Sequence, residues 1–516
     1  MNKVSFILIY LVLAVSVYSQ ENMRDVKILH WNDFHARNMP YEVSMKVDGE
    51  EVEYYVGGTS GMLGYLNKYR DSTSLVVNGG DDYQGTPISS ITKGFSQMHL
   101  LNLYGLDAFV LGNHEFDYGQ YELDSALQEA DFDILSANVY YEPRGTTMGK
   151  PYVIKEVNGV KIGIIGLTAF ELPELVVPKN LNETRMLDTD SVTKAGIAAL
   201  KEAGCDMIIL LTHIGEDEDK KMAAKYYADV DVIVGGHTHS PLKKPVIQNG
   251  VIIVQAGSLG RYLGKLDLQV DTEKDTVIFY SGELVETVMD SSIMDMRAQQ
   301  EVELMMADIE DELGEVIGML ETPWERQAVR ESNLGQWEAD VFRKAAGTDI
   351  GLMNSGGLRA DLDAGAITVN DIWTINPFGN TIVTMEVSGK VLKEMLTNAI
   401  RKNYLEMKEG TRPDIPVTSG LEIEFDSEKI MTGNEEILIA IKVNGDPLDE
   451  NKNYTIATNN YVGEQFEKFF GTISNKPELK DTNMIDRDAL IDAVKEQKVI
   501  NKKRENKVID INYKEK

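Results

Sequence analysis

The sequence predicts an α/β protein with two domains, and three observations support this. From Val26 to about Val285, short apolar runs bounded by Gly, Asn or Asp alternate with stretches of helical periodicity, a pattern typical of layered α/β domains. An acidic stretch of helical spacing follows, from about Ser291 to Ile317. None of the seven histidines lies after residue 239, so imidazole chemistry is expected only in the first domain. At roughly 150 residues per domain, the 516 residues leave room for about three domains.

The strands of the first domain are expected at seven apolar runs. Each run fits a buried strand that is followed by polar residues or glycine. Helices are expected between these strands at Gly61 to Arg70 and Val192 to Ala203. The runs are Val26–Leu29, Leu75–Val77, Ala108–Leu111, Val160–Leu167, Met207–Leu211, Val230–Val234 and Val251–Val254.

The acidic stretch predicts one long amphipathic helix, because Val302, Met306, Ile309 and Leu313 recur at helical spacing. We interpret it as a bridge between the domains; the alternative is a surface helix of the first domain. A second domain is expected to follow. Its predicted elements are a helix at Leu334–Ala346, strands at Asp349–Met353, Ile382–Val387 and Tyr454–Ala457, and a turn at Val443–Asp446.

The first 19 residues have the pattern of a secretory signal peptide. Lys3 precedes an apolar run from Val4 to Val17, and small residues stand before a cleavage point after Ser19. No second long apolar run follows, so no membrane anchor is expected after cleavage, and the protein is expected to be periplasmic or secreted. The net charge of −32 argues against stable binding to nucleic acid or to an anionic membrane.

Polar motifs follow five of the expected strands. In an open α/β sheet the carboxyl ends of the strands line one crevice, so these motifs are expected to converge. Asp33 with His35 and His237 with His239 are spaced two residues apart, which puts both side chains on one side of an extended segment. The motifs are Asn32-Asp33-Phe34-His35, Gly79-Gly80-Asp81, Gly112-Asn113-His114-Glu115-Phe116-Asp117, Thr212-His213 and Gly235-Gly236-His237-Thr238-His239.

These motifs offer enough ligands for two divalent metal ions that share one carboxylate. Imidazole suits zinc and related transition metals, and carboxylate and amide oxygens also admit manganese or magnesium. Zinc, manganese or cobalt is expected, with magnesium as the alternative. Two ions about 4 Å apart can clamp the oxygens of a displacement at phosphorus, and they supply positive charge that so acidic a chain otherwise lacks.

In combination, the motifs resemble those of the calcineurin-like metallophosphoesterases and, more narrowly, of the 5′-nucleotidase/UDP-sugar hydrolase family. The narrower resemblance rests on Trp31–His35, Gly80–Pro87, Gly112–Gly119, Asn354–Arg359 and Asn376–Asn380. It implies a four-layer α/β/β/α metallophosphoesterase domain over residues 24–290, a linker helix over 291–324 and an α+β substrate-binding domain over 325–516.

The resemblance also implies roles for individual residues. One metal would be held by Asp33, His35 and His239, the other by Asn113, His213 and His237, and Asp81 would bridge them. His114 would donate a proton or hydrogen bond to the phosphoryl or leaving oxygen, and Asp117 would orient His114.

The resemblance places the substrate's nucleoside on the second domain. Arg359 would bind phosphate or carboxylate oxygens, supported by Asn354 and Gly357, and Phe378 would stack on the base. The segment that carries the second stacking ring departs from the family pattern; Phe469 is the expected ring and Phe466 the alternative.

The implied function is removal of phosphate from nucleoside 5′-monophosphates by metal-activated water. One alternative keeps the metals and changes the ester: a UDP-sugar or nucleotide pyrophosphatase, or a 2′,3′-cyclic-nucleotide phosphodiesterase with 3′-nucleotidase activity. Another is a solute-binding or adhesive exported protein with a vestigial site, which is disfavoured because every ligand position holds a competent residue.

Overall fold

A computed structural model of the chain describes residues 22–47, 50–176, 178–326, 331–408, 416–434, 436–473 and 475–512. The signal peptide predicted over residues 1–19 lies outside them. The chain forms two compact units, divided between Asp308 and Ile309. None of the described helices has the length and hydropathy needed to cross a bilayer.

Two six-stranded sheets form the centre of the first unit. The first has the order β17 (Thr276–Glu286), β16 (Tyr262–Asp271), β1 (Met23–Trp31), β4 (Ser74–Asn78), β5 (Ala108–Val110) and β6 (Asp133–Leu135). The second has the order β14 (Val246–Gln248), β15 (Val251–Val254), β13 (Val232–Val234), β12 (Met207–Thr212), β10 (Val160–Leu167) and β9 (Tyr152–Val157). Strands β1, β4, β5 and β6 are parallel to one another, as are β10, β12, β13 and β15.

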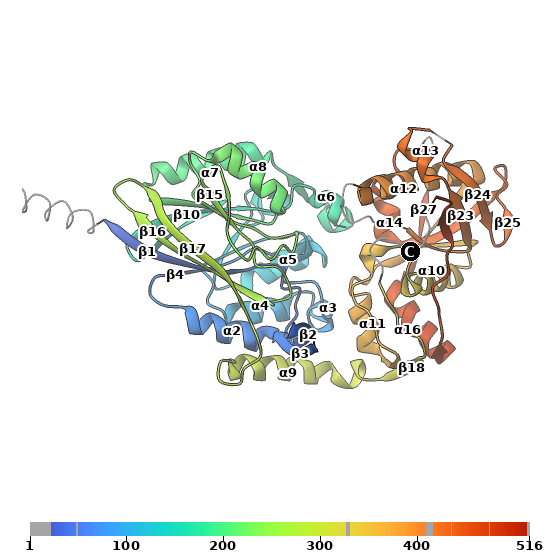
Figure 1. Cartoon of the computed structure of the whole chain (residues 1–516), viewed down its shortest axis with the longest axis horizontal. Coiled ribbons are helices and arrows are strands. Elements are labelled where there is room, and N and C mark those ends of the chain that lie inside the picture. Colours follow the sequence, from blue (N-terminus) through green and yellow to red (C-terminus); the bar gives the residue numbers. More distant parts are fainter. Residues whose placement is uncertain are drawn as a thin grey trace, which may run out of the picture. The chain divides into compact units, whose positions relative to one another are not determined.

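Helices cover the outer face of each sheet, which gives the four layers that the family resemblance implies (Figure 1). Helices α2 (Gly58–Tyr69) and α4 (Phe95–Asn102) pack on the first sheet, and α7 (Thr189–Glu202) and α8 (Glu216–Tyr226) pack on the second. Shorter helices α3 (Pro87–Ile91), α5 (Gln120–Ala126) and α6 (Leu172–Leu175) and the hairpin of β2 (Pro40–Val47) and β3 (Glu50–Gly57) lie in the connections.

Each central strand is apolar on both faces because both faces are covered. On β1, Ile28 packs in the core between the two sheets, whereas Leu29 and Trp31 pack against the helices. On β12, Ile209 faces the core between the sheets and Leu210 faces α7 and α8. The apolar runs of the sequence correspond to this double burial.

Helix α9 (Met296–Leu313) runs through the point where the two units divide. Ala298, in its first turn, belongs to the core of the first unit, and Leu313, its last residue, belongs to a core of the second. The helix predicted between Ser291 and Ile317 is therefore present, and the domain limits at residues 290 and 325 stay predictions.

The second unit is built around a five-stranded sheet. Its order is β22 (Pro416–Ser419), β19 (Ile350–Asn354), β26 (Asn453–Asn459), β21 (Thr381–Ser388) and β27 (Leu479–Ile485). Helix α10 (Asn333–Ala346) packs on one face and α12 (Gly389–Lys408) on the other. A four-stranded sheet of β25 (Asp446–Pro447), β24 (Leu438–Val443), β23 (Leu421–Phe425) and β29 (Val508–Asp510) and a three-stranded sheet of β20 (Gly365–Thr368), β18 (Val316–Leu320) and β28 (Val499–Ile500) complete it.

Candidate active site

The polar motifs of the first unit converge at the carboxyl ends of five parallel strands. Asp33 and His35 follow β1, Asp81 follows β4 and Asn113 follows β5 in the first sheet. In the second sheet His213 directly follows β12, and the two remaining histidines, His237 and His239, follow β13. Backbone hydrogen bonds join the loops, including Asp33 N–H to Gly80 O at 2.8 Å.

Six of the seven predicted ligands fall into two groups that could each hold a metal ion. Asp33, His35 and His239 form one group, and Asp81, His213 and His237 form the other; within each group the ligand atoms lie within 4.8 Å of one another.

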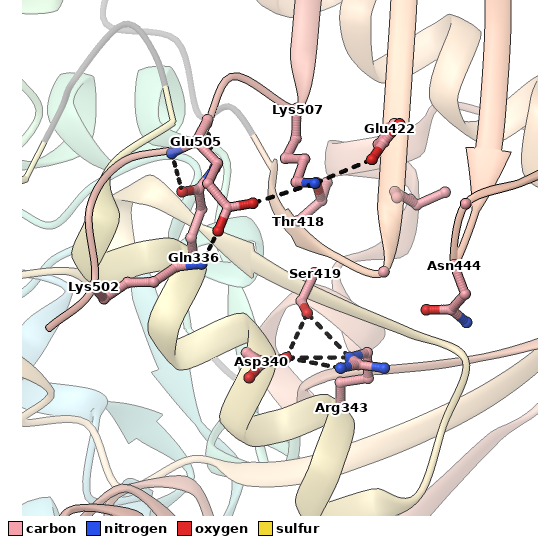
Figure 2. Close-up of a pocket in the computed structure, with 13 residues that line it drawn as sticks. Gln336, Asp340, Arg343, Thr418, Ser419, Glu422, Asn444, Lys502, Glu505 and Lys507 are labelled. Atoms are coloured by element: carbon pink, nitrogen blue, oxygen red, sulfur yellow. Dashed lines mark hydrogen bonds and ion pairs between the residues drawn. The ribbon is translucent and has the colours of Figure 1, made fainter. Parts of the chain in front are cut away.

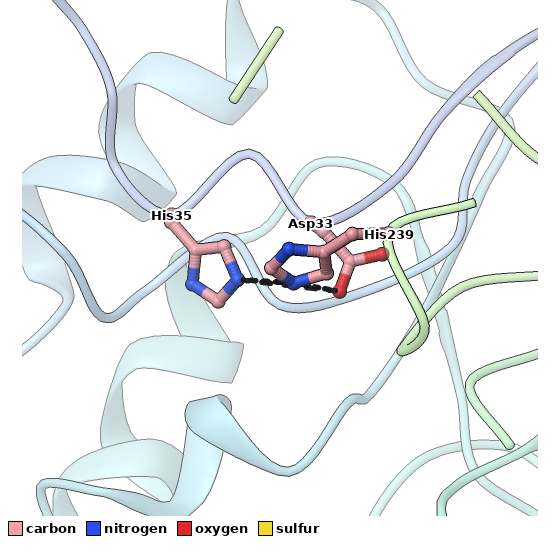
Figure 3. Close-up of side chains that lie close together, drawn as sticks. All are labelled: Asp33, His35 and His239. Carbon is pink, nitrogen blue, oxygen red and sulfur yellow. Dashed lines mark hydrogen bonds and ion pairs between the residues drawn. The ribbon is translucent and has the colours of Figure 1, made fainter. Parts of the chain in front are cut away.

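Figure 3 shows the first group, in which the Nε2 atoms of His35 and His239 are 3.1 Å apart and His239 Nε2 is 3.2 Å from Asp33 Oδ1. In the second group, His213 Nε2 lies 2.9 Å from Asp81 Oδ2. The two groups are adjacent, since His213 Nε2 is also 3.9 Å from Asp33 Oδ1.

The chemistry of the donor set fits divalent cations. Among the described residues, Asn113 Oδ1 is buried at this place without a hydrogen-bond partner, and Asp33 Oδ1 and His213 Nε2 are buried here with only another predicted ligand, His239 or Asp81, beside them. Buried polar atoms without a partner are costly unless something else satisfies them. All three belong to side chains that the sequence predicts as metal ligands, and Asn113, the seventh predicted ligand, is among them.

The electrostatics of the site favour positive charge. Burial alone would lower the pKa of His213, but the charges of Asp81 and Asp33 and the hydrogen bond to Asp81 outweigh it and raise this pKa to about 10. Burial and the charge of His213 lower the pKa of His237 to about 4. The buried carboxylates therefore draw a positive charge to this position, which is the environment that a divalent cation requires.

The backbone of these loops is held in a conformation that L-residues rarely adopt. Five of the predicted ligands have positive φ: Asp33 (51°), His35 (53°), Asp81 (60°), His237 (80°) and His239 (55°). Such strain persists only where the surrounding structure enforces it, and it is concentrated at functional sites. Gly112 contributes by its lack of a side chain, since a Cβ there would lie 2.2 Å from Asp81 Oδ1.

His114 and Asp117 form a pair beside the two groups. His114 Nδ1 lies 2.6 Å from Asp117 Oδ2, and the backbone N–H of His114 donates to Asp81 Oδ1 at 2.8 Å. The ring of His114 lies 5.2 Å from that of His35 in an edge contact. Its side chain is 16% exposed, whereas His213 is fully buried, so His114 is more accessible to solvent than His213.

Matches to two protein-family models agree with this geometry. Residues 26–241 match the calcineurin-like phosphoesterases, and residues 315–472 match the 5′-nucleotidase C-terminal domain. The chain belongs to the 5′-nucleotidase family of calcineurin-like metallophosphoesterases. This is a family of metal-dependent phosphoester hydrolases.

Individual relatives of this 5′-nucleotidase family member support the assignment over most of the chain. Protein UshA of Yersinia enterocolitica is 27% identical over 92% of this chain and 91% of its own length. The trifunctional nucleotide phosphoesterase YfkN of Bacillus subtilis is 27% identical, and the match spans 32% of its length. The structure of a 5′-nucleotidase precursor from Thermus thermophilus superimposes with a TM-score of 0.81, at 28% identity over 95% of this chain and all of the other.

Glu115 is buried beside the ligand groups, and the sequence motifs alone indicate no role for it. Its carboxylate accepts hydrogen bonds from four backbone N–H groups, at 2.7–3.2 Å: those of Asp81, Asp82, Tyr83 and Gly112. It thereby ties the Asp81 loop to the turn that carries Asn113 and His114. Burial and the charge of Asp81 raise its pKa to about 7.

We expect Glu115→Gln to lower the free energy of unfolding by about 1–3 kcal/mol, since an amide nitrogen cannot accept hydrogen bonds and would leave buried N–H groups unpaired. Urea unfolding of metal-free protein measures this. Glu122→Gln is the matched control, because Glu122 pairs with Lys93 at the surface, and a change below about 0.5 kcal/mol is expected there. Equal effects of the two substitutions would contradict the role of Glu115.

In the second unit, the residues predicted to bind substrate occupy two neighbouring loops. Asn354 ends β19, Gly357 lies in the turn that follows, and the backbone N–H of Arg359 donates to Ile375 O at 2.9 Å. The Arg359 guanidinium carbon lies 5.6 Å from the centre of the Phe378 ring. The structure therefore brings the cation of Arg359 and the aromatic ring of Phe378 together, and their substrate-binding roles stay predictions.

Phe469 lies in a different environment. It is 4% exposed and packs in a core of the second unit, as does Phe466 at 1%. The half-buried Tyr461 lies 5.8 Å from the Phe469 ring in an edge contact. Tyr461 lies in the short helix α14 (Asn460–Glu464). The residue before this helix, Asn459, donates its side chain to Asn354 Oδ1 at 3.1 Å, so α14 is joined to the substrate loop.

A separate polar pocket of 310 Å³ lies near the start of β19, at the opposite end of this strand from the substrate loop (Figure 2). Ser419, in its wall, pairs with Gly351 near the start of β19, whereas the substrate loop follows Asn354 at the end. The three cations and three acids of its lining, Arg343, Lys502, Lys507, Asp340, Glu422 and Glu505, form ion pairs with one another. Its charge is balanced, so it lacks the positive excess that a nucleotide phosphate would need.

Proposed function

We propose that this protein is an exported two-metal phosphohydrolase that removes the phosphate from nucleoside 5′-monophosphates. The observation that carries the proposal is the pair of adjacent ligand groups in the first unit, beside a partly exposed imidazole held by a carboxylate. Export rests on the pattern of Met1 to Ser19, and mass spectrometry of the mature N-terminus in the native host tests it.

The proposed metal ligands are those that the family resemblance implies. Asp33, His35 and His239 would hold one ion, Asn113, His213 and His237 would hold the other, and Asp81 would be the ligand that both share. Zinc, manganese or cobalt suits this donor set, and magnesium is the alternative. When bound, two such ions withdraw charge from the phosphoryl oxygens and lower the pKa of water, so that a nucleophile is available at neutral pH.

His114 and Asp117 supply the proton chemistry in this proposal. The Asp117 carboxylate accepts from Nδ1 of His114, which fixes the ring and leaves Nε2 as the nitrogen that faces the substrate. Nε2 of His114 donates to a phosphoryl oxygen or to the leaving 5′ oxygen as negative charge builds up on that oxygen.

The second unit recognises the nucleoside. Arg359, with Asn354 and Gly357 in the same loop, binds anionic oxygens of the substrate, and Phe378 stacks on the base. Phe469 stays the predicted second ring. We add Tyr461 as a candidate for that role, because stacking needs an accessible face and the burial of Phe469 and Phe466 leaves them little.

The second candidate keeps the metal centre and changes the ester to a nucleotide pyrophosphate, a UDP-sugar or a 2′,3′-cyclic nucleotide. The burial of Phe469 favours it, since a less complete base clamp would select less strictly for one nucleotide. The Bacillus subtilis relative is named a trifunctional nucleotide phosphoesterase, which is consistent with broad use of phosphate esters.

The deciding experiment measures product release from AMP, UMP, UDP-glucose, ATP and 2′,3′-cyclic AMP. Chelator-treated protein is tested alone and after addition of Mn²⁺, Zn²⁺, Co²⁺ or Mg²⁺, with UDP-glucose also scored by UMP formation. We expect turnover of AMP and UMP that is lost without metal and regained with it, together with a rise in melting temperature on metal addition. Turnover of UDP-glucose or the cyclic ester alone would replace the first proposal by the second.

A further inference from the structure

The loop that carries Phe378 is held in place by two residues at the start of a helix that comes later in the chain. This loop, residues 376–380, connects α11 (Val369–Ile375) to β21. Its partners are Asp486 and Arg487, the first two residues of α16 (Asp486–Gln497). They lie more than 100 residues further along the chain, directly after β27, which pairs with β21.

Asp486 binds both ends of the loop. Its fully buried carboxylate accepts a hydrogen bond from Asn376 Nδ2 at 3.1 Å, and its backbone N–H donates to Asn380 O at 2.8 Å. The residues on the two sides of Phe378 are therefore tied to a single point.

Arg487 binds the middle of the loop. Its Nη1 donates to Pro377 O at 3.3 Å, and its guanidinium carbon lies 3.3 Å from the centre of the Trp373 ring. The backbone at Gly379 crosses the guanidinium so closely that a Cβ there would lie 3.3 Å from Nη2, and φ at Gly379 is +62°. The Arg487 guanidinium thus lies between this loop and α11.

We propose that Asp486 and Arg487 are positioning residues that hold Phe378 where a nucleobase stacks on it, and so set the affinity for nucleotides without touching them. The proposal rests on the proposed function. Contacts to the pair are made by Asn376, Pro377, Gly379 and Asn380, the four residues around Phe378. A loop held in its binding conformation before the substrate arrives loses less entropy on binding, and this raises affinity.

The test compares AMP with ribose 5-phosphate, which carries the same phosphate and sugar but no base. Arg487→Met keeps the apolar stem and removes the planar cation. We expect the KM for AMP to rise about tenfold, within the range seen when a base loses its stacking partner, with kcat and the KM for ribose 5-phosphate unchanged. Lys495→Met is the control, because it removes an exposed cation from the same helix, and neither KM should change.

A double-mutant cycle shows whether Arg487 acts through Phe378. If it does, Arg487→Met has no further effect on the KM for AMP in protein that already carries Phe378→Ala. If Arg487→Met does not fold, Arg487→Lys, which keeps the charge but not the planar group, replaces it with a smaller expected rise.

An unchanged KM for AMP in the folded variant, equal losses on both substrates, or additive effects in the cycle would each overturn the positioning role. Wild-type protein that fails to hydrolyse AMP with any metal would instead overturn the proposed function and this inference with it.

Discussion

Replacing Asp81 by Asn is expected to reduce phosphate release from AMP to background while the protein stays folded. Asp81 belongs to the ligand group of His213 and His237 and is the ligand proposed to be shared; its Oδ2 lies 2.9 Å from His213 Nε2, and its Oδ1 accepts a hydrogen bond from the backbone N–H of His114. Asn keeps an oxygen for that N–H and tolerates the φ of 60° at this position. The substitution therefore removes the negative charge, which a shared ligand between two cations requires, without removing the shape.

The measurements are turnover of AMP, bound metal per chain by elemental analysis, and melting temperature. We expect turnover at background, a lower metal content and, without added metal, a melting temperature close to that of wild type. Asp107→Asn is the matched control: Asp107 also accepts a backbone N–H, that of Val76 at 2.8 Å, but at the start of β5 rather than at the end of β4. Retained turnover in Asp81→Asn would remove Asp81 from the proposed centre.

The architecture and most of the candidate metal ligands could be predicted from the sequence because both depend on local patterns. Continuous apolar runs mark strands that are buried on both faces, and polar residues directly after such runs must lie at one edge of the sheet. Asp33, Asp81 and His213 are therefore brought together by topology alone. The strands β16 and β17 were not among the seven predicted runs, because in β16 buried and half-buried residues alternate instead of forming a continuous apolar run.

The contacts that hold the site could not be predicted, because they join segments far apart in sequence through backbone groups. The Glu115 carboxylate accepts hydrogen bonds from four backbone N–H groups, and Asp486 forms hydrogen bonds with both ends of a loop about 110 residues earlier. No residue-type pattern encodes such contacts. Positive φ at Asp33 and Asp81 is equally invisible, because local rules reserve that conformation mainly for glycine.

The burial of Phe469, by contrast, had a signal in the sequence. Phe466, Phe469 and Phe470 follow the i, i+3, i+4 spacing of a buried helical face, and they line the core side of α15 (Phe466–Phe470). This periodicity indicates burial for Phe469, which the family resemblance implies as the second stacking ring. Tyr461, outside that stripe, is the half-buried ring of the segment.

Replacing His114 by Ala is expected to lower kcat for AMP by about 10²–10⁴-fold, the range for loss of a positioned proton donor, with both metals still bound. His114 is partly exposed, pairs with Asp117 and belongs to neither ligand group. Asp117→Asn should lower kcat less, by about ten- to a hundredfold, as for other groups that orient a functional imidazole. His99→Ala removes an exposed imidazole from α4 and should change nothing.

Metal content separates this role from that of the ligands. A proton donor that is lost leaves the ions in place, so the activity of His114→Ala should be low at full metal occupancy and should not recover with excess Mn²⁺ or Zn²⁺. A ligand that is lost lowers occupancy, and excess metal then restores part of the rate. Recovery of His114→Ala by excess metal would make His114 a ligand, and the proton that the leaving 5′ oxygen requires would then have to come from another group of the site.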